Sequence, residues 1–296
     1  MKNNKFEVDL SNPKYSTDWL RYYITSCRYG LSFKTNLDSN KCNFNLVTDT
    51  YGLVNSGSKK SANVICGSSF GQGIGVDFQS TWFNKLAHKE DYFNISFPVG
   101  THNHLRRLTD LYSGKSNLLF YLYHPNSFIC SYMFYQSELK NMDIFKSMNW
   151  RTDSFYKYKL ILSYPFRLSI KRLLGRIIYF DGYKLDRNYC LFNFRDANFL
   201  KSESANLISL FSKFEHVFAF KVPIKEELCN LKPFKPLKKS ISENYFTFLD
   251  ITKSLPNLTH FDLTRNFTLT DYHKYDNHWN ESGNTKFVNH LKELFL

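Results

Sequence analysis

Short apolar runs recur along the chain, and each of them ends at a glycine, a proline or a polar residue. The runs that we expect to form strands cover residues 64–66, 91–97, 117–123, 217–222 and 259–263. Helices are expected at residues 101–111, 205–214, 243–254 and in a closing segment that runs to about residue 294. Because strands that alternate with helices favour a parallel sheet flanked by helices, the pattern predicts an α/β fold. In such sheets the loops at the carboxyl ends of the strands build the functional site.

Two parts of the chain depart from this alternation. Residues 1–45 show no strong periodicity, and we expect an N-terminal extension packed on the core, with one short helix near residues 17–26. Residues 131–205 carry apolar and basic helical patterns with few turn signals, which favours a helical insertion. The amphipathic, basic segment 160–178 has an alternative role at a membrane surface. Residues 46–296, including the insertion, are expected to form a single domain.

The most informative stretch is the glycine-rich segment 63–76. Its apolar run stops at Gly67, two serines follow, and helical spacing resumes near Asp77. The pattern indicates a buried strand, a tight turn and a helix, which would expose a serine hydroxyl at the carboxyl edge of a sheet beside free backbone N–H groups. A glycine-rich turn without chemistry is the alternative, as is a phosphate loop. No Gly-Lys-Ser/Thr follows, which disfavours a nucleotide P-loop.

A serine nucleophile needs a base that takes its proton and an acid that orients the base. The C-terminal stretch contains Asp-x-His twice, as Asp271/His273 and Asp276/His278. Two residues apart, an aspartate can reach Nδ1 of the histidine and leave the other ring nitrogen for the serine. A polar loop is the structural alternative. The same four side chains could also bind a metal ion, but no further cluster supports that interpretation.

These residues converge on a family. In four blocks the sequence resembles the SGNH, or GDSL-type, hydrolases, and the blocks follow the family's order. Gly67-Ser68-Ser69 with the later glycines resembles the Gly-Asp-Ser nucleophile block, and the segment 94–100 resembles the block whose glycine donates a backbone N–H to the oxyanion. His124-Pro125-Asn126-Ser127 is similar to the Gly-x-Asn-Asp block, and Asp276-x-His278-x-Asn280-x-x-Gly283 to the block of acid and base.

The resemblance implies a three-layer α/β/α, flavodoxin-like fold with a mostly parallel sheet, and it assigns roles by position. Ser69 would be the nucleophile, His278 the base and Asp276 the orienting acid. The oxyanion hole would combine the Ser69 N–H, an N–H from Ser96 or Gly100, and Asn126. The sequence departs from the family pattern in both halves of the site. Ser68 replaces the usual aspartate, Ser96 stands where glycine is common, and Gly100 lies one position later than expected. His124 and Ser127 replace Gly and Asp.

The implied chemistry is acyl transfer through a serine ester, with no cofactor and no metal. The leading expectation is an O-acyl esterase that acts on an ester-bearing carbohydrate or polysaccharide. A carbohydrate O-acetyltransferase with the same triad is the close alternative, because only the acceptor differs. An inactive basic module that binds a glycan or a surface is the alternative of a different class.

Charge adds a question about partners. The formal net charge is +13, and the basic residues are densest at 167–176 and 232–239. No sequence signature of a nucleic-acid-binding motif is present, so we expect an anionic membrane surface or an acidic polysaccharide rather than nucleic acid. The N-terminus lacks the apolar core of a signal peptide, no apolar run is long enough to span a bilayer, and the six cysteines are scattered. We therefore expect a location in the cytoplasm, either free or at the periphery of the membrane.

Overall fold

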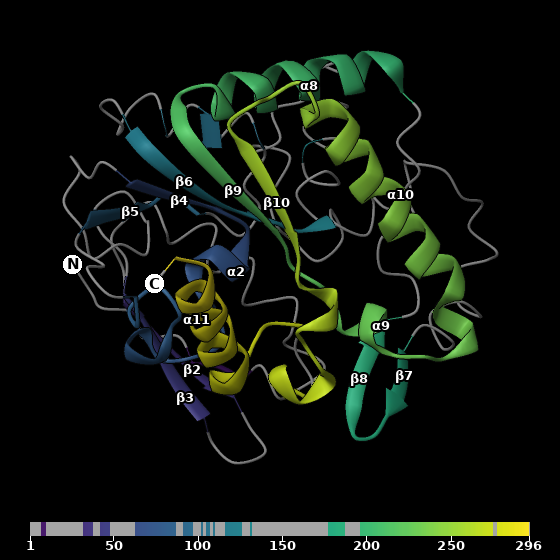
Figure 1. Ribbon diagram of the computed structural model, residues 1–296. Coiled ribbons are helices and arrows are strands. Elements are labelled where there is room, and N and C mark those ends of the chain that lie inside the picture. The colour runs from purple at the N-terminus through teal and green to yellow at the C-terminus, as the bar shows by residue number, and fades with distance from the viewer. Residues whose placement is uncertain are drawn as a thin grey trace, which may run out of the picture.

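The computed structural model describes residues 7–9, 32–37, 42–47, 63–86, 91–96, 102, 105–106, 109, 116–125, 131, 177–186, 196–274 and 277–295. Within these ranges the chain forms a five-stranded central sheet, a three-stranded sheet and a two-stranded hairpin. Helices flank the central sheet (Figure 1). None of the helices in this part of the chain is both long enough and apolar enough to cross a membrane.

The central sheet confirms all five strands that the apolar runs predict. Its strands are β4 (Asn63–Gly67), β5 (Tyr92–Asn94), β6 (Ser116–Tyr123), β9 (Phe214–Lys221) and β10 (Leu258–Asp262). Their order is β10-β9-β6-β4-β5, and every neighbouring pair is parallel. This is the flavodoxin-like order, in which the chain leaves the first strand in one direction and later returns to its other side. The crevice at this reversal, between β4 and β6, is where such sheets bind ligands.

Side chains of the sheet alternate between two apolar layers. On β6, Leu119, Tyr121 and Tyr123 belong to one buried cluster, whereas Phe120 and Leu122 belong to the other. The first cluster includes residues of α8 (Ala197–Phe211) and α10 (Lys235–Thr252), and the second includes residues of α11 (Glu281–Phe295). Figure 1 shows α11 on the opposite side of the sheet from α10. The sheet therefore has helices on both faces, and the predicted three-layer α/β/α fold is confirmed.

The composition of the Pro- and Lys-rich segment 232–239 predicts a loop, and this prediction is wrong. It forms the 3₁₀ turn η5 (Lys232–Phe234) and the first turn of α10. Proline is compatible with a first helical turn, because its missing N–H would have no intrahelical acceptor there. Phe234 and Leu237 are fully buried in a third apolar cluster, which explains why this basic stretch is ordered as a helix.

Residues 177–186 belong to the expected helical insertion, but they do not form a helix. They form an antiparallel hairpin of β7 (Ile177–Phe180) and β8 (Tyr183–Asp186). Its two turn residues, Asp181 and Gly182, have positive φ angles of 50° and 76°, as a tight hairpin turn requires. The Asp-Gly pair was the available signal in the sequence. The basic residues Arg167–Arg176 lie outside the described residues.

The helix expected at residues 205–214 begins earlier than the sequence pattern indicates. It is α8, and the side chain of Asp196 accepts hydrogen bonds from the N–H groups of Asn198 and Phe199 and caps its first turn. Residues 197–205 of the expected insertion therefore belong to a helix of the main α/β domain. An N-cap aspartate ahead of the apolar spacing was the missed signal.

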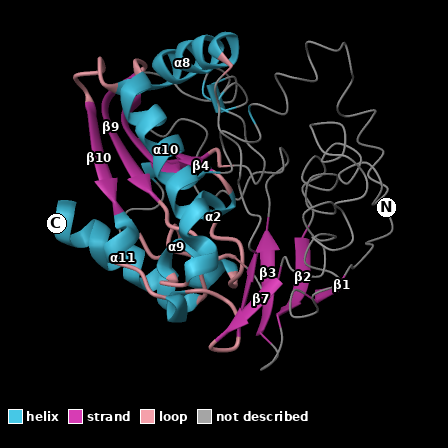
Figure 2. Ribbon diagram, turned by 90° about the vertical axis from the view of Figure 1, so that its right-hand side faces the viewer, coloured by secondary structure: helices cyan, strands magenta, loops and turns pink. Residues whose placement is uncertain are grey.

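The N-terminal residues contain strands that the sequence pattern does not indicate. They are β1 (Glu7–Asp9), β2 (Ser32–Leu37) and β3 (Cys42–Val47), which form a separate small sheet (Figure 2). β1 pairs parallel to β2, and β2 pairs antiparallel to β3. The helix expected near residues 17–26 lies outside the described residues.

Candidate active site

The glycine-rich segment forms a sharp strand-to-helix turn at the carboxyl edge of β4. The strand ends at Gly67, Ser68 is extended, and the one-turn helix α2 (Ser69–Gln72) starts directly after it. Gly73 ends α2 with a left-handed φ of 69°, a conformation that glycine adopts without strain. The prediction of a helix that begins near Asp77 is wrong. Residues 78–80 form the 3₁₀ turn η2, which is followed by further turns.

His278 contacts Ser69 at this edge. Its Nε2 atom lies 2.7 Å from Ser69 Oγ, although the two residues are 209 positions apart in the chain. Each residue is 9% exposed, so the pair is largely shielded from water without being sealed. The contact joins the turn after β4 to the loop that precedes α11.

Backbone hydrogen bonds hold this C-terminal loop at its base. Tyr272 and Trp279 form an antiparallel bridge, and the His273 N–H donates to the carbonyl oxygen of His278 at 3.1 Å. The Asn280 N–H donates to the carbonyl oxygen of Asp271 at 3.0 Å. These three contacts join the outgoing arm of the loop, residues 271–274, to its returning arm, residues 277–280, which contains His278. Asp276, the predicted orienting acid, lies outside the described residues.

The Trp-Asn-x-x-Gly sequence after His278 anchors the loop on α11. The Asn280 side chain accepts a hydrogen bond from the Gly283 N–H at 3.1 Å and donates to the carbonyl oxygens of Thr270 and Tyr272. Gly283 has no room for a side chain, because an added Cβ would lie 2.4 Å from the carbonyl oxygen of Asp271. These contacts fix the returning arm, and with it the position of His278.

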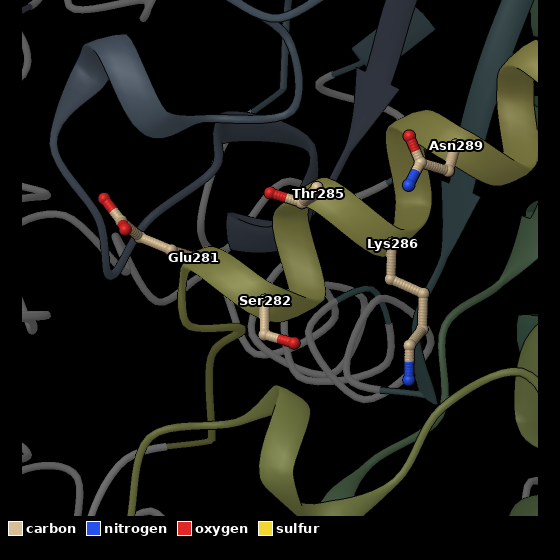
Figure 3. Close-up of a pocket in the computed structure, with 5 residues that line it drawn as sticks. All are labelled: Glu281, Ser282, Thr285, Lys286 and Asn289. Atoms are coloured by element: carbon tan, nitrogen blue, oxygen red, sulfur yellow. The ribbon is translucent and has the colours of Figure 1, made fainter.

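Asp271, the acid of the other Asp-x-His pair, has a structural role in the same loop. Its carboxylate is 1% exposed and accepts hydrogen bonds from Lys286 Nζ at 2.6 Å and Ser282 Oγ at 3.0 Å. The Thr268 N–H donates to it as well, at 2.8 Å. Ser282 and Lys286 extend from one side of α11 and also line a surface pocket with Glu281, Thr285 and Asn289 (Figure 3). Neither Ser69 nor His278 lines that pocket.

This carboxylate should make stability depend on pH. Burial alone would raise the pKa of Asp271, but hydrogen bonds from Lys286, Thr268 and Ser282 outweigh it and hold the pKa below its usual value. Because the folded pKa is depressed, the stabilisation is fully present above the unfolded value of about 3.9 and is lost as pH falls through the folded value.

We expect Asp271→Asn to lower the free energy of unfolding by about 1.5–3 kcal/mol at pH 7, the usual range for hydrogen bonds to a charged group. The difference from the wild type should shrink as pH falls towards 3. Urea unfolding at pH 7, 5, 4 and 3 measures it. Asp250→Asn is the matched control, because the Asp250 carboxylate pairs with Lys253 at the exposed surface. A pH-independent loss in Asp271→Asn would contradict the expectation.

His273 does not contact the Ser69 hydroxyl in this structure. Its ring lies instead against the backbone of Gly75, since a Cβ added at Gly75 would be 3.0 Å from His273 Nε2. Gly75 has a φ of 112°, so a side chain at this position would also strain the backbone. His273 therefore packs the loop against the glycine-rich segment, while His278 reaches the serine.

The second block of the resemblance is tied to α2 by side-chain amides. Asn94 Nδ2 donates to the carbonyl oxygen of Gly71 at 2.9 Å, and Gln72 Nε2 donates to that of Ser96 at 2.8 Å. The Ser96 N–H donates to Asn94 Oδ1 at 2.9 Å. This N–H therefore already has an acceptor in the structure, and the choice between Ser96 and Gly100 as the oxyanion donor remains a prediction. Gly100 and Asn126 lie outside the described residues.

Gly71 permits the close approach of this block. A Cβ at Gly71 would lie 2.2 Å from Ser96 Oγ, so even alanine would force the two segments apart. Ser96 is fully buried. Packing next to the candidate nucleophile therefore requires a glycine at position 71.

His124 is a site neighbour that sequence reasoning treated only as a departure from the family pattern. It directly follows β6, is 2% exposed and stacks on Phe70 with ring centroids 4.9 Å apart. The Phe70 ring lies 5.4 Å from that of His278. Burial and, to a smaller extent, the nearby His278 lower the pKa of His124 to about 3. His124 is therefore neutral at physiological pH and adds no positive charge beside His278. Its place at a strand end was the available signal.

Comparisons with known proteins give weak likenesses. No family model matches the chain, and no curated protein matches it. Among solved structures, an extracellular lipase from Streptomyces rimosus is similar at 9% identity, with 80% of this chain and 99% of that chain covered and a TM-score of 0.44. An α/β hydrolase enzyme from the metagenome of Lake Arreo is similar at 10% identity, with 80% and 95% covered and a TM-score of 0.40. The functional argument therefore rests on the geometry of the site.

Proposed function

We propose that this protein is a serine-dependent enzyme that cleaves or transfers acyl esters. The observation that carries the proposal is the 2.7 Å contact between His278 Nε2 and Ser69 Oγ at the carboxyl edge of the sheet. A hydroxyl bonded to an imidazole nitrogen is the arrangement that activates serine as a nucleophile. Its place beside β4 and β6 coincides with the crevice where sheets of this order bind ligands.

In the proposed reaction, Ser69 Oγ attacks the ester carbonyl carbon while His278 Nε2 takes the hydroxyl proton. The tetrahedral intermediate collapses, the bond from carbon to the leaving oxygen breaks, and His278 returns its proton to the leaving alkoxide. The acyl group then remains on Ser69 as an ester. A second hydroxyl, from water or from a sugar, attacks this ester with His278 again as the base, and the enzyme is restored.

The Ser69 N–H is a proposed donor to the oxyanion. Ser69 is the first residue of α2, so its N–H has no acceptor within the helix. Asp276 as orienting acid, and Gly100 and Asn126 as further donors, remain proposals that rest on the resemblance. In a well-studied serine protease, removal of one oxyanion donor raises the activation barrier by about 2.7–4 kcal/mol.

The finer proposal is an esterase that removes acyl, and in particular acetyl, groups from a carbohydrate or polysaccharide. Its support is the resemblance of the Asp276-x-His278-Trp279-Asn280 ending to relatives that handle acylated polysaccharides. A carbohydrate O-acetyltransferase would use the same residues with a sugar hydroxyl as acceptor. The resemblance does not separate water from sugar as the acceptor.

Incubation with an acetyl donor, with and without glycan acceptors, tests the proposal and separates these cases. Release of acetate without an acceptor identifies an esterase, and acetyl appearing on the glycan identifies a transferase. If acetylated glycans bind but no acetyl group is released or moved, and p-nitrophenyl acetate is also inert, the protein is a binding module and the enzymatic proposal is wrong.

A further inference from the structure

Lys225 is a fully buried lysine beside the loop that carries His278. It is the first residue of α9 (Lys225–Leu228), the short helix that follows β9 at the carboxyl edge of the sheet. Its Nζ atom lies 3.0 Å from the carbonyl oxygen of His273 and 3.2 Å from that of Lys274. One ammonium group therefore binds two consecutive carbonyls of the outgoing arm of the loop.

These two carbonyls lie at the end of the series of hydrogen bonds that joins the two arms of the loop. The last bond between the described residues of the two arms runs from the His273 N–H to the carbonyl oxygen of His278, and Lys274 is the last described residue of the outgoing arm. An ammonium has three N–H donors and no acceptor, so it can satisfy both carbonyls at once and fix the direction in which they point. Lys225 thus holds the end of the outgoing arm, next to the bond that joins this arm to His278.

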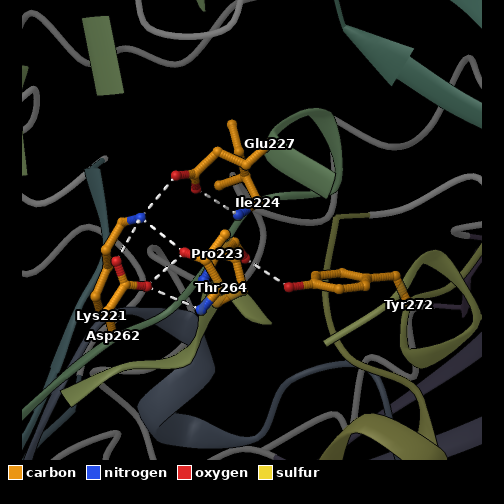
Figure 4. A network of polar contacts seen from close by, with 7 residues as sticks. All are labelled: Lys221, Pro223, Ile224, Glu227, Asp262, Thr264 and Tyr272. Carbon is orange, nitrogen blue, oxygen red and sulfur yellow. Dashed lines mark hydrogen bonds and ion pairs between the residues drawn. The ribbon is translucent and has the colours of Figure 1, made fainter. Parts of the chain in front are cut away.

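The chain around Lys225 is itself firmly held. Tyr272 Oη donates to the carbonyl oxygen of Pro223 at 2.6 Å, and Glu227 accepts from both Lys221 Nζ and the Ile224 N–H (Figure 4). The Tyr183 ring of the hairpin lies 5.9 Å from Lys225 Nζ, within the range of a cation–π contact. The ammonium therefore extends from a segment held by hydrogen bonds to the outgoing arm of the loop.

We propose that Lys225 is a positioning residue for His278, and this inference rests on the proposed function. By holding the carbonyls of His273 and Lys274, Lys225 keeps the loop in the path that places His278 Nε2 against Ser69 Oγ. A displacement of about 1 Å in a catalytic group can cost roughly 100-fold in rate. Loss of the ammonium is therefore expected to act on turnover through the loop, without direct contact with the ester.

The test compares Lys225→Met, Lys225→Gln and Lys221→Met in the full chain, each checked for folding by circular dichroism. With p-nitrophenyl acetate, Lys225→Met should lower kcat about 10- to 100-fold and leave KM within about twofold. Lys225→Gln should recover part of the loss, because its amide can still donate to a carbonyl. Hydrogen exchange of the peptide covering residues 272–280 should be faster in Lys225→Met.

Lys221→Met is the matched control, because Lys221 is also buried but bonds to Glu227, Asp262 and Thr264 rather than to the loop. It should lose stability, yet keep kcat within about threefold at temperatures where it is folded, because Glu227 keeps its bond to the Ile224 N–H and Lys225 keeps its bonds to the loop. Wild-type kcat and wild-type exchange in Lys225→Met would overturn the inference, as would equal losses of kcat in the two lysine variants. If the wild type itself hydrolyses no ester, the proposed function fails, and the exchange measurement still decides whether Lys225 holds the loop.

Discussion

Ser69→Ala is expected to reduce hydrolysis of p-nitrophenyl acetate to the uncatalysed background. The reason is that the variant removes Oγ, the atom that His278 Nε2 contacts, while leaving the turn after β4 intact. Ser69 is 9% exposed at the start of a one-turn helix, and alanine fits the same backbone. In a well-studied serine protease, loss of the nucleophile alone costs on the order of 10⁶ in kcat.

Ser68→Ala is the matched control for this prediction. The Ser68 hydroxyl is 4% exposed and, among the residues that the structure describes, has no hydrogen-bond partner. It does not contact His278, so the variant should keep a measurable share of wild-type turnover. Full activity in Ser69→Ala, or loss in Ser68→Ala alone, would show that the nucleophile has been assigned to the wrong serine.

His278→Ala is expected to fall to the level of Ser69→Ala, because no other described residue is placed to take the proton from Ser69 Oγ. His273→Ala should stay within about tenfold of the wild type, a change of roughly 1.4 kcal/mol in barrier. Its bond to the returning arm uses a backbone N–H, which alanine retains, and its ring packs on Gly75. Turnover of the same ester by both variants, each verified to be folded, makes the comparison.

The reverse pattern would identify a different base. If His273→Ala were inactive and His278→Ala active, the working loop would differ from the described one, and Asp271 would have to leave its hydrogen bonds to Lys286 and Ser282 to act as the acid. Such a result would also remove the reason for assigning Asp276 as the orienting group.

The inner strands β4 and β6 could be predicted from sequence because they are buried on both faces. Their sequences are continuous apolar runs, such as Leu118–Tyr123 in β6, and these are visible without knowledge of their partners. The order of the strands could not be derived in the same way. It depends on contacts between segments far apart in the chain, including the pairing of β6 with β9.

Local patterns failed where tertiary contacts decide the structure. The Lys-rich segment 232–239 has the composition of a loop, but burial of Phe234 and Leu237 makes it a helix start. The hairpin at 177–186 lies in an apolar, basic stretch whose spacing suits a helix, and only its Asp181-Gly182 turn indicates strands.

The candidate site shows the same division. The short motifs were sufficient to select Ser69 and His278, which the structure brings into contact. They could not show that Asn94 accepts the Ser96 N–H, because that bond depends on the orientation of the Asn94 amide, which also donates to the Gly71 carbonyl of α2. Lys225 carries no motif at all, and its role follows only from the two carbonyls that its ammonium binds.

Peptide mapping of a fluorophosphonate adduct tests the central claim most directly. The reagent forms a stable ester only with an activated serine, and mass spectrometry then locates the modified residue. We predict a single phosphonylated serine, Ser69, with no labelling in Ser69→Ala or His278→Ala and normal labelling in Ser68→Ala. An unlabelled wild type that is folded, or an adduct at Ser68 or another serine, would contradict the account.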